Sequence, residues 1–278
     1  MAAPPSDRDL AASAARKAGA IAMGSFRGTL AVRHKAPDQP LTDADVAIDA
    51  LLHRLLAQAR PAYGWLSEES VDRPDRLARA RVWVVDPIDG TRSYIAGRRE
   101  FSISIGLAED GDAVVGVVHN PATGELYRAE RGEGAFRRDT EEDEPARLHV
   151  ATPSARERPV LLASRSEIAA AELAPFADRF EIRPCGSTAY KLALVAAGAA
   201  DAFLSRGPKS EWDVCAGALL VQEAGGRVTD LAGRPLRFNR PQPFVQGILA
   251  TRGDLHDTLL AALASLPPTP RMTRAVDD

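Results

Sequence analysis

Residues 82–91 read Val82-Trp83-Val84-Val85-Asp86-Pro87-Ile88-Asp89-Gly90-Thr91, and the fold can be worked out from this stretch. Its first four residues are β-branched or aromatic, which is typical of a buried strand. We expect the strand to end at Asp86, because Pro87 has no N–H to donate to a ladder. The chain would then turn, with two carboxylates three residues apart in that turn.

These two carboxylates, on Asp86 and Asp89, indicate a ligand site. Two negative charges held so close repel each other by about 4 kcal/mol at an effective dielectric of about 20, and a divalent cation would offset that repulsion. Gly90 allows the backbone to approach a ligand closely. The N–H groups of Gly90 and Thr91 could open a helix and receive an anion. A metal-bound phosphate fits this combination, and an ordinary Asx turn with capping aspartates is the alternative.

The composition is that of a soluble globular protein. The chain has 278 residues, of which 45% are hydrophobic and 26% are charged, and this length allows one large domain or two smaller ones. The net charge of −3 argues against a nucleic acid polymer or an anionic membrane surface as the main partner. No apolar run approaches the length of a membrane-spanning helix.

The two cysteines, Cys185 and Cys215, show no metal-type spacing, which fits a reducing cytoplasm. Residues 1–9 mix prolines with charges and contain no apolar signal sequence, so we expect a cytoplasmic protein. Cys215 could be a redox-sensitive thiol, although a buried core cysteine is the favoured interpretation.

The first half of the chain, residues 1–147, reads as an α+β unit. An alanine-rich helix is expected to end near Ser25, and a second helix follows Thr42 with its apolar residues on one face. Asp110-Gly111 is a hairpin signal, and residues 137–147 form a charged hairpin or linker. Strands are expected at 32–35, 63–66, 81–86, 102–107, 113–118 and 125–131, the later ones as an antiparallel meander.

The second half, residues 148–278, reads as an α/β unit with some parallel pairing, because strands and helices alternate. Strands are expected at 160–163, 180–183, 202–205 and 245–250. Helices are expected at 167–177, 187–197, 211–224 and 254–264.

Two more carboxylates stand at the ends of expected elements. Glu68 follows the strand 63–66, and Asp213 begins the helix 211–224, where capping is the plain interpretation. Together with Asp86 and Asp89 they form an oxygen-rich set that suits Mg²⁺. No histidine neighbours these positions, which argues against a zinc hydrolase. Neither a nucleophile elbow nor a P-loop lysine is present.

Four ordered motifs resemble those of the inositol monophosphatase-like phosphatases, which are Mg²⁺-dependent and lithium-sensitive. Residues 84–91 are similar to the Asp-Pro-(Ile/Leu)-Asp-Gly-Thr signature of that family. The agreement in order and spacing runs from about residue 7 to about residue 265. The other three motifs are Thr42-Asp43-Ala44-Asp45, Ser67-Glu68-Glu69-Ser70, and Trp212-Asp213 followed by Ala216-Gly217 and Glu223-Ala224-Gly225-Gly226.

The resemblance implies a layered αβαβα sandwich, like that of inositol monophosphatase and fructose-1,6-bisphosphatase, with the site between two halves. It also implies two or three Mg²⁺ ions, held by Glu68, Asp86, the Ile88 carbonyl, Asp89 and Asp213. Thr91, with Asp45 behind it, and Glu68 would orient and deprotonate the attacking water. Asp89, Asp213 and the N–H groups of Gly90 and Thr91 would contact the phosphorylated substrate. A homodimer is left open.

Within this family the bacterial 3′(2′),5′-bisphosphate nucleotidases are the branch that the chain resembles most. Arg206 stands where inositol monophosphatases carry a glutamate, and Arg206 with Lys209 suits a second phosphate. Ser187 and Thr188 lie in a matching Gly-Ser-Thr segment and would also contact the substrate. The implied reaction converts adenosine 3′,5′-bisphosphate into AMP and phosphate. An inositol or other sugar monophosphatase is the alternative, and a non-catalytic regulatory module is a remote one.

Overall fold

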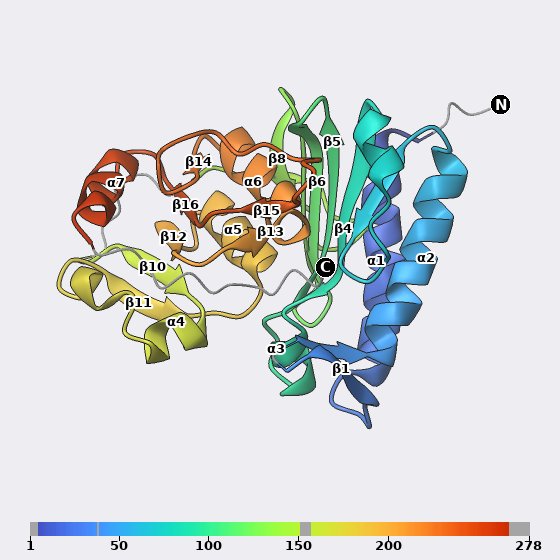
Figure 1. Cartoon of the computed structure of the whole chain (residues 1–278), viewed down its shortest axis with the longest axis horizontal. Coiled ribbons are helices and arrows are strands. Elements are labelled where there is room, and N and C mark those ends of the chain that lie inside the picture. Colours follow the sequence, from blue (N-terminus) through green and yellow to red (C-terminus); the bar gives the residue numbers. More distant parts are fainter. Residues whose placement is uncertain (1–4, 38, 151–156, 267–278) are drawn as a thin grey trace.

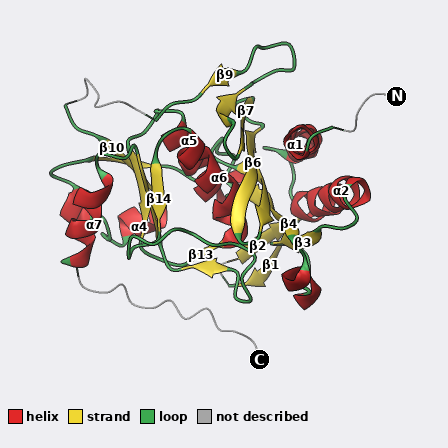
Figure 2. Ribbon diagram, turned by 90° about the horizontal axis from the view of Figure 1, so that it is seen from above, coloured by secondary structure: helices red, strands yellow, loops and turns green. Residues whose placement is uncertain are grey.

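The computed structural model describes residues 5–37, 39–150 and 157–266. Two β-sheets face each other, with helices between them and on both outer sides (Figure 1). Seen from above, helices and sheets alternate in five layers, which is the predicted αβαβα sandwich (Figure 2). The principal helices are α1 (Asp7–Ser25), α2 (Asp43–Ala59), α5 (Thr188–Ala196), α6 (Glu211–Glu223) and α7 (His256–Ala264).

The larger sheet has seven strands in chain order, and only its first two strands are parallel. This arrangement confirms the predicted meander. Asp110 and Gly111 form the predicted tight turn, with φ of +50° and +86°. The strands are β3 (Gly64–Ser67), β4 (Arg81–Asp89), β5 (Ser102–Glu109), β6 (Asp112–Asn120), β7 (Glu125–Glu130), β8 (Gly134–Arg137) and β9 (Ala146–Arg147).

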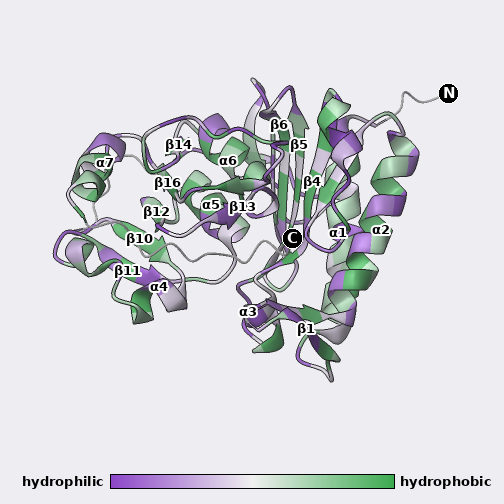
Figure 3. Ribbon diagram, in the orientation of Figure 1, coloured by the Kyte–Doolittle hydropathy of each residue, from purple (hydrophilic) through white to green (hydrophobic). Residues whose placement is uncertain are grey.

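Strand β4 is covered on both faces, which explains its unbroken apolar run. Trp83 and Val85 pack in a cluster with α1 and α2 on one side. Val82 and Val84 pack in a cluster with α5 and α6 on the other. Figure 3 shows hydrophobic residues concentrated along the strands and on the helix faces that meet them. The end of β4 is therefore held rigidly inside the molecule.

The smaller sheet has the strand order β11-β10-β12-β16-β14. Strand β10 runs parallel to both its neighbours, so the predicted parallel pairing is confirmed. Helix α7 and the 3₁₀ turn η2 (Ala174–Phe176) cover its outer face. The strands are β10 (Val160–Ala163), β11 (Glu181–Pro184), β12 (Ala202–Ser205), β14 (Arg227–Thr229) and β16 (Ile248–Thr251).

One hydrophobic cluster continues from the larger sheet through α5 and α6 to the smaller sheet. Val84 of β4 and Phe203 of β12 both belong to it, and so does Cys215 of α6. The two halves of the chain thus share one core. Their division at residues 147 and 148 stays a prediction.

Two predicted elements are interrupted in the structure. The expected helix 167–177 is split into α4 (Arg165–Ala169) and η2, because Ala171 adopts a φ of +54° and Pro175 begins a new turn. The expected strand 245–250 is split into β15 (Phe244–Val245) and β16, because Gly247 adopts a φ of +74°. Apolar periodicity alone did not reveal either break.

Several short elements were not predicted, because they are too brief to carry a periodic pattern. Strand β1 (Val32–Ala36), predicted at 32–35, is confirmed, and it forms a hairpin with the unpredicted β2 (Gln39–Thr42) beside helix α3 (Thr91–Ile95), at the lower end of the larger sheet in Figure 1. The unpredicted elements also include the 3₁₀ turn η1 (Pro74–Ala78) and β13 (Lys209–Ser210). None of the described helices is long and apolar enough to cross a membrane.

Candidate active site

The two aspartates of the opening stretch lie at the end of β4. The expectation that the strand stops at Asp86 was wrong, because β4 continues to Asp89. The ladder with β5 instead skips Pro87 and Ile88, so that Asp86 lies opposite Ser104 and Asp89 lies opposite Ser102. The irregularity accommodates the missing N–H of the proline within the strand. Both aspartate side chains are buried.

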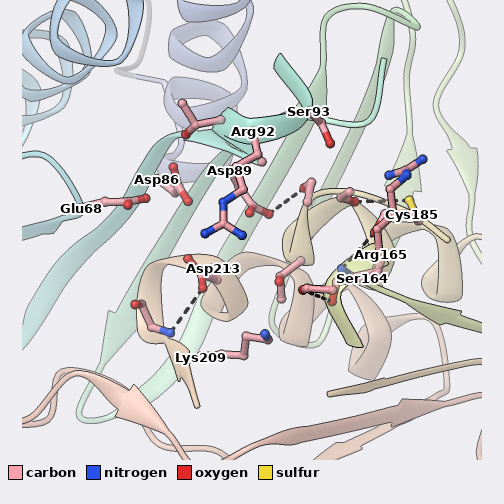
Figure 4. Close-up of a pocket in the computed structure, with 18 of the residues that line it drawn as sticks. Glu68, Asp86, Asp89, Arg92, Ser93, Ser164, Arg165, Cys185, Lys209 and Asp213 are labelled. Carbon is pink, nitrogen blue, oxygen red and sulfur yellow. Dashed lines mark hydrogen bonds between the residues drawn. The ribbon is translucent and has the colours of Figure 1, made fainter. Parts of the chain in front are cut away.

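Three carboxylates from different segments converge near this strand end. One oxygen each from Glu68, Asp86 and Asp213 lies within 4.8 Å of the others (Figure 4). Among the described residues, Oδ1 of Asp86 finds no hydrogen-bond partner although it is buried. Burial raises the pKa of Asp86 well above its ordinary value, and the charges of Glu68 and Asp89 raise it further. A buried, unpaired carboxylate oxygen among other carboxylates fits a bound cation.

Asp89 lines the same cavity but is held differently. Its Oδ2 accepts hydrogen bonds from the Ser187 hydroxyl and from the Ala189 N–H, both at 2.6 Å. Burial raises the pKa of Asp89, and these two hydrogen bonds oppose that rise. Asp89 is not part of the converging group of three. The backbone of α5 thus fixes one of its oxygens, and its assignment as a metal ligand stays a prediction.

Thr91 and Asp45 lie together, and the catalytic roles implied for them by the resemblance stay predictions. The Thr91 hydroxyl contacts the Ile88 carbonyl at 3.0 Å and Oδ1 of Asp45 at 3.4 Å. The other oxygen of Asp45 accepts the N–H of Thr42 at 2.7 Å, which completes a capping box at the start of α2. Burial raises the pKa of Asp45. A carboxylate fixed by its own helix cap therefore faces the hydroxyl.

Gly90 allows this turn to pack against the second half of the chain. It adopts a φ of +93°, and a Cβ there would lie 3.0 Å from the Glu100 carbonyl oxygen and 3.1 Å from the Ser187 nitrogen. A side chain would therefore meet backbone atoms on two sides. The glycine is required by the close contact between the two halves at the site.

Lys35 is a site residue whose role the sequence did not reveal. Its Nζ lies 3.0 Å from Oε1 of Glu68 and 2.9 Å from both oxygens of Glu69. Burial raises the pKa of Glu69 to about 7 in spite of this ion pair. Lys35 comes from the β1–β2 hairpin, whose strand β1 is exposed along its whole length. Nothing in such a surface strand indicates which acidic group its lysine will meet.

Basic side chains, here called the basic wall, line the same cavity. Arg165, Lys191 and Lys209 line the cavity, whose volume is about 360 Å³. Lys191 is buried, with Nζ 3.3 Å from the Cys185 carbonyl oxygen and 4.9 Å from the centre of the Phe203 ring. Burial lowers its pKa. Figure 4 shows Lys209 on the same side of the cavity as Asp213, and Arg165 near Ser164.

Two carboxylates partly balance these cations. Nζ of Lys209 lies 3.8 Å from Glu167, which also accepts a hydrogen bond from the Ser164 hydroxyl at 2.5 Å. Arg165 forms two contacts with Glu100, at 2.5 and 2.9 Å. The basic wall is thus built from fixed side chains and not from free surface lysines. Sequence reasoning found Lys209 but gave no substrate role to Arg165 or Lys191.

The remaining predicted substrate residues differ in whether they line the cavity. Ser187 and Thr188 both line the cavity, and the Ser187 hydroxyl donates a hydrogen bond to Asp89. Arg206 is not among the described residues that line the cavity, and its charge acts on Glu172 instead. The expectation that Arg206 faces the substrate is therefore not supported. Only Gly207 and Pro208 separate it from Lys209, yet Lys209 lines the cavity and Arg206 does not.

Comparison with known proteins places the chain among phosphatases. The sequence profile of the inositol monophosphatase family matches residues 6–267. The chain belongs to this family. It is therefore a phosphatase, a hydrolase of phosphate monoesters. The layered fold agrees with that of solved family members.

Relatives within the inositol monophosphatase family carry different substrate names. The 3′(2′),5′-bisphosphate nucleotidase CysQ of Aggregatibacter actinomycetemcomitans is 31% identical, over 83% of this chain and 87% of its own. The inositol-1-monophosphatase of Mesorhizobium japonicum is 38% identical, over 73% of this chain and 77% of its own. The extragenic suppressor protein SuhB of Bartonella henselae has a similar structure, with a TM-score of 0.79 at 32% identity, covering 92% of this chain and 98% of that one. Family membership thus leaves the substrate open.

Both cysteines are buried. Cys215 has no exposed surface, and burial raises the pKa of its thiol well above the ordinary value. Burial also raises the pKa of Cys185 to about 12. A thiol that resists ionisation is a poor nucleophile, which agrees with the favoured interpretation of Cys215 as a core residue.

Proposed function

We propose that this phosphatase is Mg²⁺-dependent and removes the 3′-phosphate from adenosine 3′,5′-bisphosphate, giving AMP and phosphate. The observation that carries the proposal is one cavity lined both by carboxylates, here called the acidic wall, and by the basic wall of Arg165, Lys191 and Lys209. The acidic wall would hold the metal and the reacting phosphate. The basic wall would hold a phosphate that is not cleaved.

The acidic wall suits Mg²⁺. Its donors are carboxylate oxygens of Glu68, Asp86 and Asp213, with Asp89 and the Ile88 carbonyl beside them, and hard oxygen ligands favour this ion. Bound there, Mg²⁺ would neutralise charge on the phosphate and lower the pKa of a coordinated water. Two or three ions are proposed from the family resemblance alone.

The protein's own groups would position the nucleophile and the phosphate. The Thr91 hydroxyl, fixed by Asp45 and by the Ile88 carbonyl, would accept the hydrogen bond of the attacking water and pass its proton toward Asp45. Glu68 would assist from the other side. The N–H groups of Gly90 and Thr91 would bind phosphate oxygens, which fixes the direction of attack.

Lys209 is the residue that would bind the phosphate that is not cleaved. It lines the cavity together with Lys191 and Arg165, and its nearest carboxylate, on Glu167, lies 3.8 Å away. This separation is longer than a hydrogen bond, so an anionic ligand can compete for the ammonium group. The proposal keeps the role that the sequence analysis gave to Lys209 and no longer includes Arg206.

An inositol or sugar monophosphatase is the second candidate. The Mesorhizobium japonicum inositol-1-monophosphatase favours it, at 38% identity. Arg165, Lys191 and Lys209 are charged donors, and such donors bind an anionic phosphate more strongly than the neutral hydroxyls of a ring. The basic wall therefore favours the bisphosphate.

A substrate panel tests the choice. With Mg²⁺, phosphate release is compared for adenosine 3′,5′-bisphosphate, inositol 1-phosphate and fructose 1,6-bisphosphate. The proposal predicts the highest kcat/KM for the nucleotide, and a preference for inositol 1-phosphate would overturn it. Loss of a charge-assisted contact costs roughly 1.5–3 kcal/mol, so Lys209→Ala should lower kcat/KM for the bisphosphate by about 10- to 150-fold.

Arg206→Ala is the matched control for that substitution. Both changes remove one positive charge from the same short segment, but the side chain of Arg206 does not line the cavity. We expect Arg206→Ala to retain near wild-type kcat/KM. Equal losses in the two variants would show that only general electrostatics is being measured.

Two expectations stay predictions from the sequence, namely a cytoplasmic location and the absence of a nucleic acid partner. A homodimer stays open.

A further inference from the structure

Ser104 connects two of the converging carboxylates. It lies directly opposite Asp86 in the β4–β5 ladder. Its hydroxyl donates a hydrogen bond of 3.0 Å to the carbonyl of Trp212, the residue before Asp213. Ser104 is completely buried. One hydroxyl thus joins the strand pair that carries Asp86 to the helix that carries Asp213.

Two glycines bring that helix down onto the sheet. A Cβ at Gly106 would lie 2.6 Å from the Cys215 Sγ, and a Cβ at Gly116 would lie 2.4 Å from the Ala216 carbonyl oxygen. Gly106 and Gly116 face each other in the β5–β6 ladder. The first turns of α6 therefore rest almost on the backbone of the sheet. A side chain at either glycine would push α6 away from the sheet.

We propose that Ser104, supported by Gly106 and Gly116, is a positioning residue that sets the distance between Asp213 and Asp86. Asp213 is the only one of the three converging ligands that comes from the second half of the chain. Its place relative to Asp86 and Glu68 depends on where α6 sits, because its own side chain is short. The Ser104 hydroxyl and the two glycines fix that place. The inference rests on the proposed metal site but not on the proposed substrate.

The test measures Mg²⁺ affinity directly, by titration calorimetry on the purified full-length protein. Changes in groups that orient metal ligands typically weaken binding about 10- to 100-fold, and we expect a Kd increase of this order for Ser104→Ala. Gly116→Ala should weaken Mg²⁺ binding as well, because the added methyl group would push the start of α6 away from the sheet. Ser104→Thr, which keeps the hydroxyl, should retain more of the affinity than Ser104→Ala.

Thr229→Val is the matched control. It also removes a buried hydroxyl, one that contacts His256 and the Asp230 carbonyl in the smaller sheet, away from the site. We expect it to lower the melting temperature of the metal-free protein about as much as Ser104→Ala, with Mg²⁺ affinity unchanged.

The outcomes separate this inference from the proposed function. A wild-type Kd for Mg²⁺ in Ser104→Ala, or an equal loss in Thr229→Val, would overturn the positioning role. A wild-type protein that binds no Mg²⁺ would overturn the metal proposal itself. Preference for another phosphate ester would overturn the substrate alone and leave the positioning role standing.

Discussion

The Ser187 hydroxyl donates a hydrogen bond of 2.6 Å to Oδ2 of Asp89, across the boundary between the two halves of the chain. Ser187 adopts a φ of +56°, which is unusual for a residue other than glycine, and its backbone lies against Gly90. Backbone strain of this kind often accompanies a constrained site. The second half of the chain thus orients an aspartate that belongs to the first.

Ser187→Ala tests this relationship. We expect kcat to fall about 10-fold or more, because Asp89 loses a charge-assisted hydrogen bond worth roughly 1.5–3 kcal/mol. Ser102→Ala is the control, since it removes a buried hydroxyl that contacts Ser187 at 3.0 Å and leaves the hydrogen bond from Ser187 to Asp89 in place. Steady-state kinetics should show a clear loss in the first variant and a small one in the second. Equal effects would mean that Ser187 does not act through Asp89.

Thr91→Ala should separate water orientation from metal binding. The change removes the hydroxyl that lies between Asp45 and the Ile88 carbonyl, and leaves the three converging carboxylates untouched. Loss of general-base assistance costs about 10²- to 10⁴-fold in rate. We expect a decrease of that size in kcat, with the Mg²⁺ affinity retained in calorimetry. Wild-type turnover in this variant would contradict the role given to Thr91.

Mg²⁺ should stabilise the protein, and Asp86→Asn should remove that effect. At a free Mg²⁺ concentration one hundred times the Kd, binding adds about 2.7 kcal/mol to the free energy of unfolding. Asp86 is buried near other carboxylates, so replacing its charge should raise the melting temperature of the metal-free protein. Thermal melts with Mg²⁺ or a chelator check both statements. A lower melting temperature for metal-free Asp86→Asn, together with a rise on adding Mg²⁺, would contradict both statements.

His119 should contribute to the loss of stability in acid. Burial lowers its pKa from 6.5 to about 4 in the folded protein. Between pH 6.5 and about 4, His119 is protonated in the unfolded chain but neutral in the folded protein. The free energy of unfolding therefore decreases as the pH falls through this range. His119→Asn should show a smaller drop in unfolding free energy across this range, measured by urea titration at several pH values. A parallel pH dependence would contradict the assignment.

Much of the fold was predictable because its elements are long and periodic. Trp83 and its neighbours identified a strand buried on both faces, and Asp110-Gly111 identified a hairpin. The breaks at Ala171 and Gly247 were missed, because a single left-handed residue leaves no periodic signal. Pro87 was read as a strand end, whereas the ladder passes it with an irregularity.

The candidate site divides in the same way. Glu68, Asp86 and Asp213 were predicted to converge because each stands at the end of an element, and the structure brings them together. The basic wall was largely missed, since Lys191 lies within an apolar helix and Arg165 begins the short helix α4. Which of Arg206 and Lys209 faces the cavity depends on a turn whose geometry no local pattern indicates.

The most direct measurement for the proposed function is ³¹P NMR of adenosine 3′,5′-bisphosphate incubated with the protein and Mg²⁺. We predict that the 3′-phosphate signal disappears while inorganic phosphate and the 5′-phosphate of AMP appear in equal amounts, and that a chelator stops the reaction. An unchanged spectrum under conditions in which inositol 1-phosphate is hydrolysed would contradict the proposal.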